Sequence, residues 1–553
     1  FRDKPMKTFD WVNPYPSVRI PLFARNVVST SHPLAAQAGL RMLLKGGNAV
    51  DAAIAAAATI VLVEPVSCGL GGDCFAIVWD GKELHGLNSS GVAPAAWNTE
   101  YFKAKYGTGP DGLAIQPKRG WDAVTVPGVV AGWAALHEKL GKLPFEQLFE
   151  PAIEIAERGY AVPPVVAHKW NAAAEELKSQ PGYAQAFMPE GRAPKVGEHF
   201  RFPDAANTLR RIAESGGRDF YEGELAERIA AFSKECGGAM TLEDLRNYRP
   251  DWVKPISKSY RGYELHEIPP NGQGIAALIA LGIVERFDMS DIPVDSVQSQ
   301  HIQIEAMKLA FADLYKYVAD PRAMQVTPEQ MLSDAYLDSR AKLIRLDQAT
   351  HFEAGRPHAG GTIYLTAADE NGMMISFIQS NYMGFGSGVV VPGTGISMQN
   401  RGVGFSMDPK SANVVEGDKR PFHTIIPGFL TRGGKPVMSF GVMGGDMQPQ
   451  GHMQTVVRMI DYHQNPQAAC CAPRWKVNRD FTLDIETNMK ASTIAGLKDL
   501  GHALKSVDDP YMDFGAGQFI WRMSESDNEL GYVAASDSRR DGQAVGFLSL
   551  IHI

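Results

Sequence analysis

The segment from Asp51 to about Val63 restricts the possible folds more than any other part of the chain. It is rich in alanine and otherwise aliphatic. A helix of this composition has no polar stripe to turn toward solvent, so neighbouring layers must cover most of its surface. The apolar run, Ala52–Val63, is also far shorter than the roughly 20 residues that a membrane-spanning helix needs. The segment therefore predicts a helix that is buried between the layers of a globular core.

Regular elements are predicted on both sides of this helix. Ser31-His32-Pro33 is typical of a helix start, and the apolar residues of Leu34–Leu44 keep helical spacing until Gly46-Gly47. After the buried helix, the glycine-rich segment Cys68–Asp73 bends the chain into an apolar strand, Cys74–Trp79. This part of the chain thus predicts two helices followed by a strand.

The character of the sequence changes at residue 362. Residues 127–162 predict a pair of helices joined by a Gly-Lys-Leu-Pro turn, and residues 205–235 and 295–350 predict charged helices of an outer layer. The polar segment 350–361 is typical of a loop. From residue 362 onward, short β-prone runs alternate with Gly and Pro. We therefore expect one piece of the protein to end, and another to begin, near residue 361.

Thr362–Ala368 and Met373–Gln379 predict the two strands of a β-hairpin. Both runs are β-prone, and the segment Asp369–Gly372 between them ends in Asn-Gly, the strongest short hairpin signal. With a two-residue loop, paired residues have numbers that add up to about 741–743. Thr362 then lies opposite Gln379, Ser380 or Asn381. The pairing therefore brings the hydroxyl of Ser380 close to the start of the first strand.

Thr362 is a candidate nucleophile. A threonine hydroxyl becomes reactive when a free α-amino group on the same residue accepts its proton. An α-amine has a pKa of about 8, so a useful fraction is unprotonated near neutral pH. This arrangement requires cleavage of the Gly361–Thr362 bond, which the hydroxyl itself can start by attacking the unobstructed carbonyl of Gly361. Taken alone, the pattern also fits an ordinary strand residue that follows two glycines.

Three widely separated blocks of sequence carry more information than any single motif. The first block contains His32-Pro33-Leu34-Ala35, Gly46–Ala53, and Glu64-Pro65 to Gly71-Gly72. The second block is Glu305–Asp313. The third block runs from Thr362 through Gly395-Ile396, Lys419-Arg420-Pro421 and Gly444-Gly445 to Ala472-Pro473-Arg474. In order and spacing, the blocks resemble the gamma-glutamyltranspeptidase family of N-terminal-nucleophile hydrolases, from about residue 25 to about residue 545.

The resemblance implies a fold, a cleavage site and a set of catalytic residues. The implied fold is of the α/β class, the four-layer α/β/β/α sandwich of N-terminal-nucleophile hydrolases. Cleavage would give a large subunit of residues 1–361 and a small subunit of residues 362–553 that stay intertwined. Thr362 matches the nucleophile, Ser380 matches a threonine that hydrogen-bonds it, and Gly444 and Gly445 match the glycines whose N–H groups form the oxyanion hole. A plain turn is the alternative interpretation of this glycine pair.

The sequence departs from the family where a glutamyl group would bind. Ser90 replaces the arginine that contacts the α-carboxylate, and Gly404 replaces the aspartate that receives the α-amino group. Because a hydrogen bond to a charged group contributes about 1.5–3 kcal/mol, these changes argue against efficient hydrolysis of glutathione. Arg401 offers another anchor for a carboxylate, with a structural ion pair as the alternative. The residues predicted to bind the substrate are Ser90, Tyr382, Arg401, His423 and Thr424.

Three functions are compatible with these residues. The first is a self-processing amidohydrolase or acyltransferase that cleaves a γ-glutamyl or related carboxyacyl amide through an acyl-threonine intermediate, with water or an amine as acceptor. The second is an acylase or small-amide hydrolase of oxamate or glutaryl type, without activity on glutathione. The third is an uncleaved pseudoenzyme that only binds a ligand. The presence of Thr362, Ser380 and the Gly444-Gly445 pair argues against the third.

Composition and short motifs restrict the partners and cofactors. A formal net charge of −8 provides no basic excess for a nucleic-acid partner. The five cysteines do not have the spacing of a disulfide framework, and the sequence contains neither CxxC nor HExxH. It also lacks GxSxG, which argues against the common type of serine hydrolase. We expect no metal, no cofactor and no membrane partner. The expected partners are a small-molecule amide and the two subunits of one precursor, with their dimerisation into a heterotetramer left open.

The termini bear on location and on boundaries. If Met6 is the start, the residues that follow it, Lys7–Pro14, lack the apolar core of a signal peptide. This favours the cytoplasm, although the chain opens with Phe1 and a leader further upstream stays open. The end of the chain, Leu548–Ile553, spells what a common sequencing adapter would encode. We therefore exclude it from the functional argument.

Overall fold

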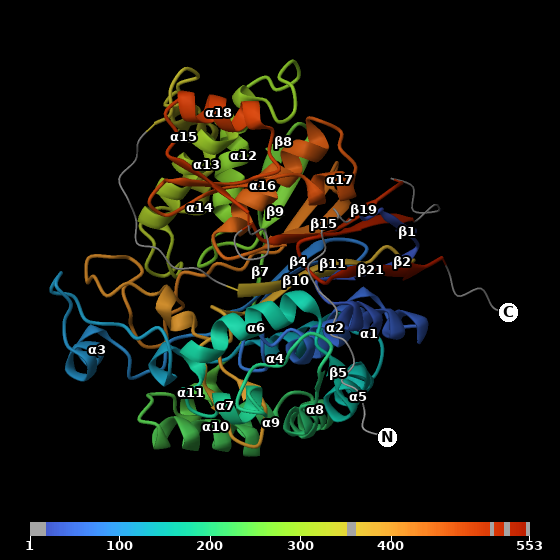
Figure 1. Ribbon diagram of the computed structural model, residues 1–553, viewed down its shortest axis with the longest axis vertical. Helices are drawn as coiled ribbons and strands as arrows, with labels where there is room; N and C mark the ends of the chain where they lie inside the picture. Colours follow the sequence, from blue (N-terminus) through green and yellow to red (C-terminus); the bar gives the residue numbers. More distant parts are fainter. Residues whose placement is uncertain (1–17, 351–360, 509–513, 525–530, 549–553) are drawn as a thin grey trace, which may run out of the picture.

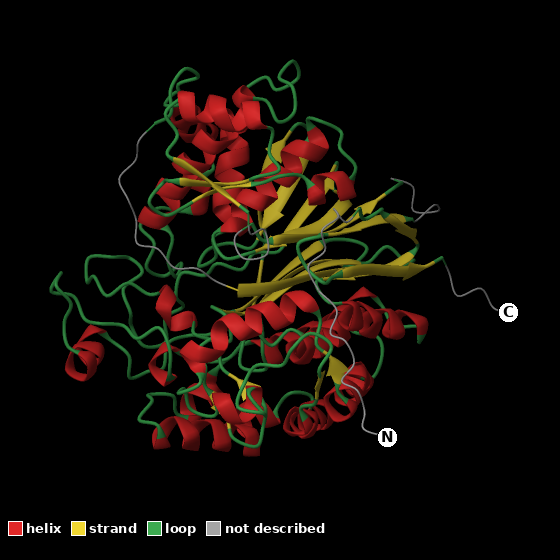
Figure 2. Cartoon of the chain, viewed as in Figure 1, coloured by secondary structure: helices red, strands yellow, loops and turns green. Residues whose placement is uncertain are grey.

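Two seven-stranded antiparallel sheets lie face to face in the middle of the molecule, and helices cover their outer faces (Figure 1). The computed structural model describes residues 18–350, 361–508, 514–524 and 531–548. Figure 2 shows the strands gathered between an upper and a lower group of helices. The architecture is therefore a four-layer α/β/β/α sandwich, which confirms the predicted fold class.

One sheet contains the strand that begins at the predicted cleavage site, and we call it the Thr362 sheet. This strand, β10 (Gly361–Ala368), pairs with β2 on one side and with β11 on the other. In spatial order, the strands are β21 (Gln543–Phe547), β2 (Asn26–Thr30), β10, β11 (Met374–Tyr382), β3 (Asp73–Trp79), β4 (Leu84–Ser89) and β7 (Asp251–Val253).

The other sheet contains the strand that leads into Gly444-Gly445, and we call it the glycine-loop sheet. In spatial order, its strands are β1 (Leu22–Ala24), β20 (Tyr532–Ser536), β19 (Ala516–Arg522), β15 (Lys435–Met443), β14 (Gly428–Arg432), β9 (Tyr263–Glu267) and β8 (Ile256–Tyr260). Both sheets combine strands from before and after residue 361. The two predicted subunits therefore share one core.

Helices from the first half of the chain cover the Thr362 sheet (Figure 1). α2 (Ala49–Val63) lies against β10 and β11, and all of its residues are buried. This confirms the buried apolar helix predicted from the sequence. α2 begins earlier than predicted because Asn48 caps it, together with Asp51, in a capping box. The other helices of this layer are α1 (Pro33–Leu44), α3 (Thr99–Tyr106), α4 (Val129–Leu140), α5 (Glu150–Arg158), α6 (Pro164–Leu177), α7 (Tyr183–Phe187), α8 (Pro203–Ser215), α9 (Asp219–Glu222), α10 (Glu224–Glu235) and α11 (Leu242–Asn247).

A second group of helices covers the glycine-loop sheet. α16 packs on β15, and α12 packs on β8 and β9. The helices of this layer are α12 (Gly274–Val284), α13 (Val297–Tyr317), α14 (Pro328–Met331), α15 (Asp334–Ala341), α16 (Met447–Ile460), α17 (Pro466–Cys471) and α18 (Ala491–Asp499). The predicted helices within 295–350 are thus present, whereas the predicted loop at 351–360 lies outside the described residues. Among the helices described, none is both long and apolar enough to cross a membrane.

Three small sheets lie outside the two main ones. Their strands are β5 (Tyr160–Ala161) with β6 (His199–Phe200), β12 (Val390–Val391) with β13 (Ile396–Ser397), and β16 (Trp475–Val477) with β17 (Leu483–Glu486) and β18 (Leu504–Val507). The β12–β13 hairpin belongs to the segment that leads from the end of β11 to Arg401.

β10 and β11 form the hairpin that the sequence predicts, but with a different loop. Ile363 pairs with Gln379, which lies within the predicted register. The N–H of Asp369 donates to the carbonyl of Met373 at 3.1 Å, so the loop has three residues instead of two. The carboxylate of Asp369 accepts hydrogen bonds from two N–H groups of the loop, and Gly372 has a φ of 90°. These side-chain bonds favour the longer loop over the two-residue Asn-Gly turn.

Candidate active site

Thr362 lies at the start of β10 with its hydroxyl against a second hydroxyl. Its Oγ1 is 3.2 Å from the Oγ of Ser380, and both side chains are buried. The Oγ of Ser380 accepts a hydrogen bond from the N–H of Tyr382 at 2.7 Å. This main-chain bond holds the Ser380 oxygen beside Thr362. The hairpin register predicted the proximity of the two residues.

Both hydroxyls face the space between the two sheets. Along β10, Thr366 Oγ1 is 2.6 Å from the Oγ of Ser439 on β15, so this face of β10 packs against the glycine-loop sheet. Two residues earlier on β10, the ring of Tyr364 covers Gly441, where an added Cβ would lie 2.5 Å from the ring. The register of β10 shifts between Gly361 and Ile363, so this pairing indicates only that Thr362 lies toward the Met443 end of β15. Met443 is the residue before Gly444.

The glycine pair between β15 and α16 has a conformation that other residues rarely adopt. The φ angles are 120° at Gly444 and 61° at Gly445. Their carbonyls accept hydrogen bonds from the N–H groups of Met447 and Gln448, at 3.1 and 3.2 Å. In the part of the chain that the structure describes, the N–H groups of the two glycines have no main-chain acceptor. At the end of β15, the pair therefore presents N–H donors that have no main-chain acceptor.

Asp73 is a buried carboxylate that sequence reasoning missed. It is the register partner of Ser380 across β3 and β11, so the two side chains lie on the same face of the sheet. Its Oδ2 is 2.9 Å from Nε2 of His423 and 3.5 Å from Nε of Arg401. From the sequence, Asp73 was predicted only to be part of a glycine-rich bend. A single acidic residue at the start of an apolar strand was a usable signal, because a buried charge needs a partner.

Arg401 is completely buried, yet its hydrogen-bonding capacity is only partly used. Nη1 donates to the Oγ1 of Thr424 at 2.9 Å, and the guanidinium carbon lies 4.3 Å from the ring centroid of Tyr382. Nε and Nη2 make no hydrogen bond within the described ranges. Burial lowers the pKa of the Arg401 guanidinium, and the charge of Asp73 opposes this effect. The side chain can therefore bind a further anion through Nη2 and Nε, with Nε also 3.5 Å from the carboxylate of Asp73.

His423 is neutral in this environment and has a defined tautomer. Its Nδ1 accepts a hydrogen bond from the N–H of Ile425 at 3.3 Å, so Nε2 carries the proton that is shared with Asp73. Burial, together with the positive charge of Arg401, lowers the pKa of His423 to about 4. The predicted residues Arg401, His423 and Thr424 thus form one cluster around Asp73, which we call the Arg401 cluster.

Tyr382 separates two arginines. It has a φ of 74°, which is rare for a residue other than glycine and typical of strain at a functional site. Arg401 covers the face of its ring. Burial raises the pKa of Tyr382, and the charge of Arg479 opposes that rise. Arg479 makes two hydrogen bonds, of 2.7 and 2.8 Å, to Asp446, the residue that follows Gly445. The sequence analysis did not identify this ion pair, because no local pattern connects the two residues.

Ser90 lies next to the Arg401 cluster, but its hydroxyl is already engaged. It donates to the Oδ1 of Asn88 at 2.7 Å and accepts from the Nδ2 of Asn271 at 3.3 Å. The connection to the cluster is made by the neighbouring residue, Gly91, whose N–H donates to Asp73 at 3.3 Å. A direct contact between Ser90 and a substrate therefore stays a prediction.

Gly404 has no space for a side chain. An added Cβ would lie 2.5 Å from the carbonyl oxygen of Phe422. An aspartate at this position would need a shift of the backbone. The packing of this segment therefore requires glycine at position 404. Restoring the acidic residue would take more than the exchange of one side chain.

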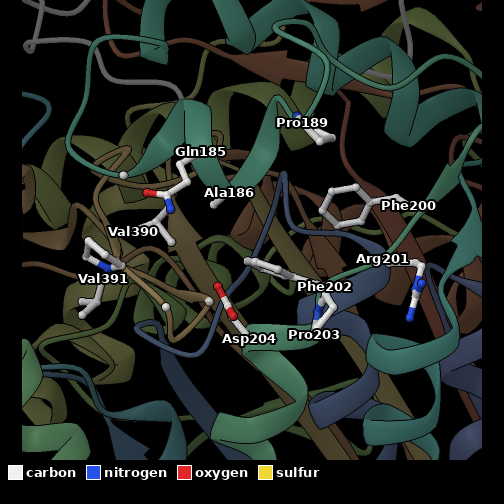
Figure 3. Close-up of a pocket in the computed structure, with 14 residues that line it drawn as sticks. Gln185, Ala186, Pro189, Phe200, Arg201, Phe202, Pro203, Asp204, Val390 and Val391 are labelled. Atoms are coloured by element: carbon white, nitrogen blue, oxygen red, sulfur yellow. The ribbon is translucent and has the colours of Figure 1, made fainter.

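A separate pocket lies between α7, α8 and the β12–β13 hairpin and has a volume of about 190 Å³ (Figure 3). Figure 3 shows Gln185, Phe202 and Asp204 around it. None of the residues predicted for the active site lines this pocket. Its lining offers no nucleophile of the kind that amide cleavage requires.

Known proteins resemble the chain over nearly its whole length. The profile of the family described as Gamma-glutamyltranspeptidase matches residues 35–547. The "Glutathione hydrolase-like YwrD proenzyme" of Bacillus subtilis (strain 168) is 37% identical over 533 residues, or 94% of this chain and 98% of that protein. The "Oxamate amidohydrolase proenzyme" of Klebsiella pneumoniae is 35% identical over 93% of this chain and 97% of that protein.

A solved structure has the same arrangement. The cephalosporin acylase from Bacillus halodurans superposes with a TM-score of 0.92 and is 48% identical, and the match covers 98% of this chain and 100% of that chain. The similarity extends to both main sheets and both helical layers, because almost no part of either chain is left unmatched.

Proposed function

The chain belongs to the gamma-glutamyltranspeptidase family and is an amidohydrolase with an N-terminal nucleophile, and we propose that this nucleophile is Thr362. The proposal includes cleavage of the Gly361–Thr362 bond, after which the α-amine of Thr362 serves as its base. The observation that carries it is the 3.2 Å contact between the buried hydroxyls of Thr362 and Ser380. Ser380 then has the role of orienting the nucleophile.

The reaction follows from these groups. The Thr362 oxygen attacks the carbonyl carbon of the substrate amide, and the α-amine takes the hydroxyl proton. The N–H groups of Gly444 and Gly445 stabilise the resulting oxyanion. The carbon–nitrogen bond then breaks, and the leaving amine takes the proton from the α-amine. In the second half of the reaction, the α-amine takes a proton from water as the water oxygen attacks the acyl-threonine ester. The ester bond then breaks, the proton passes from the α-amine to the Thr362 oxygen, and the carboxylic acid leaves.

We assign the recognition of the acyl group to Arg401. Nε and Nη2 make no hydrogen bond in the described part of the chain, although Nε lies 3.5 Å from Asp73, and together they support a two-point contact with a carboxylate on the acyl group. Thr424 and the ring of Tyr382 hold the guanidinium in place. His423 contributes by holding Asp73, and Ser90 contributes to the surrounding wall.

The packing at Gly404 favours one substrate class over another. Without an acidic side chain at that position, an α-amino group on the substrate has no proposed partner there. We therefore propose hydrolysis of an amide whose acyl group carries a carboxylate but no α-amino group, an acylase activity of oxamate or glutaryl type. The relatives named oxamate amidohydrolase and cephalosporin acylase support this choice. A γ-glutamyl amide is the second candidate, supported by the relative named glutathione hydrolase-like.

The proposal extends to assembly and location. Because each of the two sheets contains strands from both sides of residue 361, we propose that the two fragments remain associated after cleavage. The dimerisation of two such units into a heterotetramer and a cytoplasmic location are proposals that come from the sequence analysis alone.

Intact mass spectrometry of the purified protein tests the nucleophile. The wild type should separate under denaturing conditions into one fragment that ends at Gly361 and one that begins at Thr362. Thr362→Ala should remain a single chain and should hydrolyse neither a glutaryl nor a γ-glutamyl anilide, whereas Thr362→Ser should retain part of both functions because it keeps a hydroxyl. A wild type that stays whole, or a Thr362→Ala variant that is cleaved at the same bond, would show that Thr362 is an ordinary strand residue.

A further inference from the structure

Gln273 connects two segments of the proposed active site through a single amide group. It is completely buried and lies just before α12, in the predicted large subunit. Its Nε2 donates to the carbonyl of Gly445 at 2.8 Å and also to the carbonyl of Thr424. One side chain thus links the glycine loop to the segment that holds Arg401.

The orientation of this amide is determined by its partners. Both acceptors of Nε2 are carbonyl oxygens, so the reversed orientation would place oxygen against oxygen. The main chain around Gln273 is held as well, because its N–H donates to the carbonyl of His423 at 3.0 Å. In return, the N–H of His423 donates to the carbonyl of Asn271 at 3.0 Å. The link therefore starts from a fixed backbone.

The position of the Gln273 side chain costs stability, and capping of α12 does not account for it. Gln273 occupies the N-cap position of α12, yet its side chain makes no capping hydrogen bond. Its Oε1 is buried and has no partner within the described part of the chain. A buried acceptor without a partner is destabilising. The side chain therefore serves the glycine loop instead of its own helix.

The glycine loop needs such a link because its peptide groups are otherwise weakly restricted. Glycine populates positive φ angles freely, so Gly444 and Gly445 can rotate when their carbonyls are released. Among the described residues, the main-chain donors to these carbonyls are Met447 and Gln448, in the first turn of α16. Gln273 adds the hydrogen bond that ties Gly445 to a different layer of the site.

We propose that Gln273 is a positioning residue that sets the oxyanion donors at a fixed distance from the acyl-carboxylate anchor. This inference rests on the roles proposed above for Gly444, Gly445 and Arg401. Gln273 holds Gly445 with one hydrogen of its amide, and with the other it holds Thr424, the partner of Arg401. The large subunit thereby aligns two groups of the small subunit that bind opposite ends of the acyl group.

The test compares Gln273→Leu with Gln454→Leu, measured per cleaved molecule on a glutaryl anilide. Gln454 is a matched control, because it is also buried, donates from Nε2 to a main-chain carbonyl at 3.0 Å, and has an unpartnered Oε1. Gln273→Leu should lower kcat by about 10–100-fold and change KM much less, since misaligned donors act in the transition state. Gln454→Leu should lower the unfolding midpoint to a similar extent and leave kcat within about twofold of the wild type.

Gln273→Glu separates positioning from packing. A protonated carboxylic acid can still donate one hydrogen bond to a carbonyl, whereas a carboxylate cannot. The kcat of Gln273→Glu, divided by that of the wild type at the same pH, should therefore rise as the pH falls. A flat ratio, or a kcat of Gln273→Leu equal to that of Gln454→Leu, would overturn the proposal.

Gly444→Ala distinguishes a failure of this inference from a failure of the proposed function. If Gly444→Ala loses kcat and Gln273→Leu does not, the oxyanion role stands and the positioning role of Gln273 is wrong. If neither variant loses kcat, the oxyanion role itself is wrong.

Discussion

Two clusters of buried polar side chains lie in different layers of this molecule and differ in how completely they are hydrogen-bonded. One is the Arg401 cluster, which lies on the inner face of the Thr362 sheet. The other, which we call the His301 cluster, consists of His301, Glu305 and Lys308 on α13, together with His502. Comparing the two helps to separate groups that stabilise the fold from groups that await a ligand.

The His301 cluster forms a continuous series of hydrogen bonds that runs from Glu305 to the carbonyl of Arg345. Nε2 of His301 is 2.7 Å from the carbonyl of Arg345, and Nδ1 is 2.8 Å from Nε2 of His502. Nζ of Lys308 lies 3.1 Å from Nδ1 of His502 and 2.9 Å from the carboxylate of Glu305. The spacing of His301, Glu305 and His502 would suit a metal ion, but the Lys308 ammonium already provides the positive charge at this position. Within the part of the chain that the structure describes, each buried polar side-chain atom of these four residues has a partner.

The proposed active site has the opposite character. Among the described residues, Nε and Nη2 of Arg401 make no hydrogen bond, the N–H groups of the glycine loop have no main-chain acceptor, and Tyr382 has a positive φ. Each of these features costs stability in the free protein. In the function proposed above, a bound substrate and its oxyanion would complete these unused donors. The comparison thus predicts that substitutions in the His301 cluster act on folding, and that those in the active site act on catalysis.

Lys308→Met should have the largest effect and should break the closed cluster. Removing one member of a buried ion pair leaves an unpaired charge, so the free energy of unfolding should fall by about 3–5 kcal/mol. Denaturant unfolding in a Thr362→Ala background, which should keep the chain whole, measures this loss. Lys178→Met is the control: its pair with Glu175 is exposed, and its loss should cost less than about 1 kcal/mol. If Lys308→Met left stability unchanged but reduced kcat, the His301 cluster would act in catalysis and not in folding.

Gly444→Ala should displace the N–H groups that are proposed to stabilise the oxyanion. The φ of 120° and a 2.9 Å approach to the Cα of Gly515 force a new side chain to displace the loop. We expect kcat to fall by about 10²–10³-fold, or 2.7–4 kcal/mol of transition-state stabilisation, with little change in KM. Gly434→Ala controls for backbone strain, because Gly434 also has a positive φ (75°) but lies in the open turn between β14 and β15. Steady-state kinetics should show no loss of kcat for this control.

Arg401→Lys should weaken the recognition of the acyl carboxylate. Lysine keeps the charge but loses the two-point geometry, so kcat/KM for a glutaryl anilide should fall by about 10–100-fold, equivalent to 1.5–3 kcal/mol. An uncharged butyryl anilide serves as the comparison substrate, and its much lower kcat/KM should change little. Equal losses on both substrates would mean that Arg401 is a structural ion-pair partner of Asp73.

The pH dependence of stability should give the smallest effect. The pKa of His423 is about 4 in the folded protein and near 6.5 when unfolded, so between these values the unfolded chain binds more protons. The stability of the folded state should therefore decrease as the pH falls from 6.5 toward 4. Between pH 6.5 and 5, His423 should account for about 1.6 kcal/mol of this decrease. His423→Gln, compared by denaturant unfolding at both pH values, should show a smaller decrease. An identical decrease in both proteins would mean that His423 is not buried in its neutral form.

Several elements could be predicted because neighbouring residues determine them. The apolar composition of Asp51–Val63 required a buried helix, and the alternation on both sides of Asn371-Gly372 gave the register that brings Thr362 to Ser380. The hairpin loop was the exception. Its length was decided by the side chain of Asp369, which accepts N–H groups from the loop and is not part of the Asn-Gly signal.

The sequence by itself determined where the chain forms strands and helices, the family it resembles, and the candidate nucleophile. It did not reveal that Asp73 lies beside His423, 350 positions away, or that Gln273 holds Gly445, 172 positions away. Periodicity, caps and turns depend on residues within a few positions of one another, so they can be read along the chain. Which buried donors find a partner and which stay unused depends on how two sheets and their helices pack, and only the tertiary structure decides that.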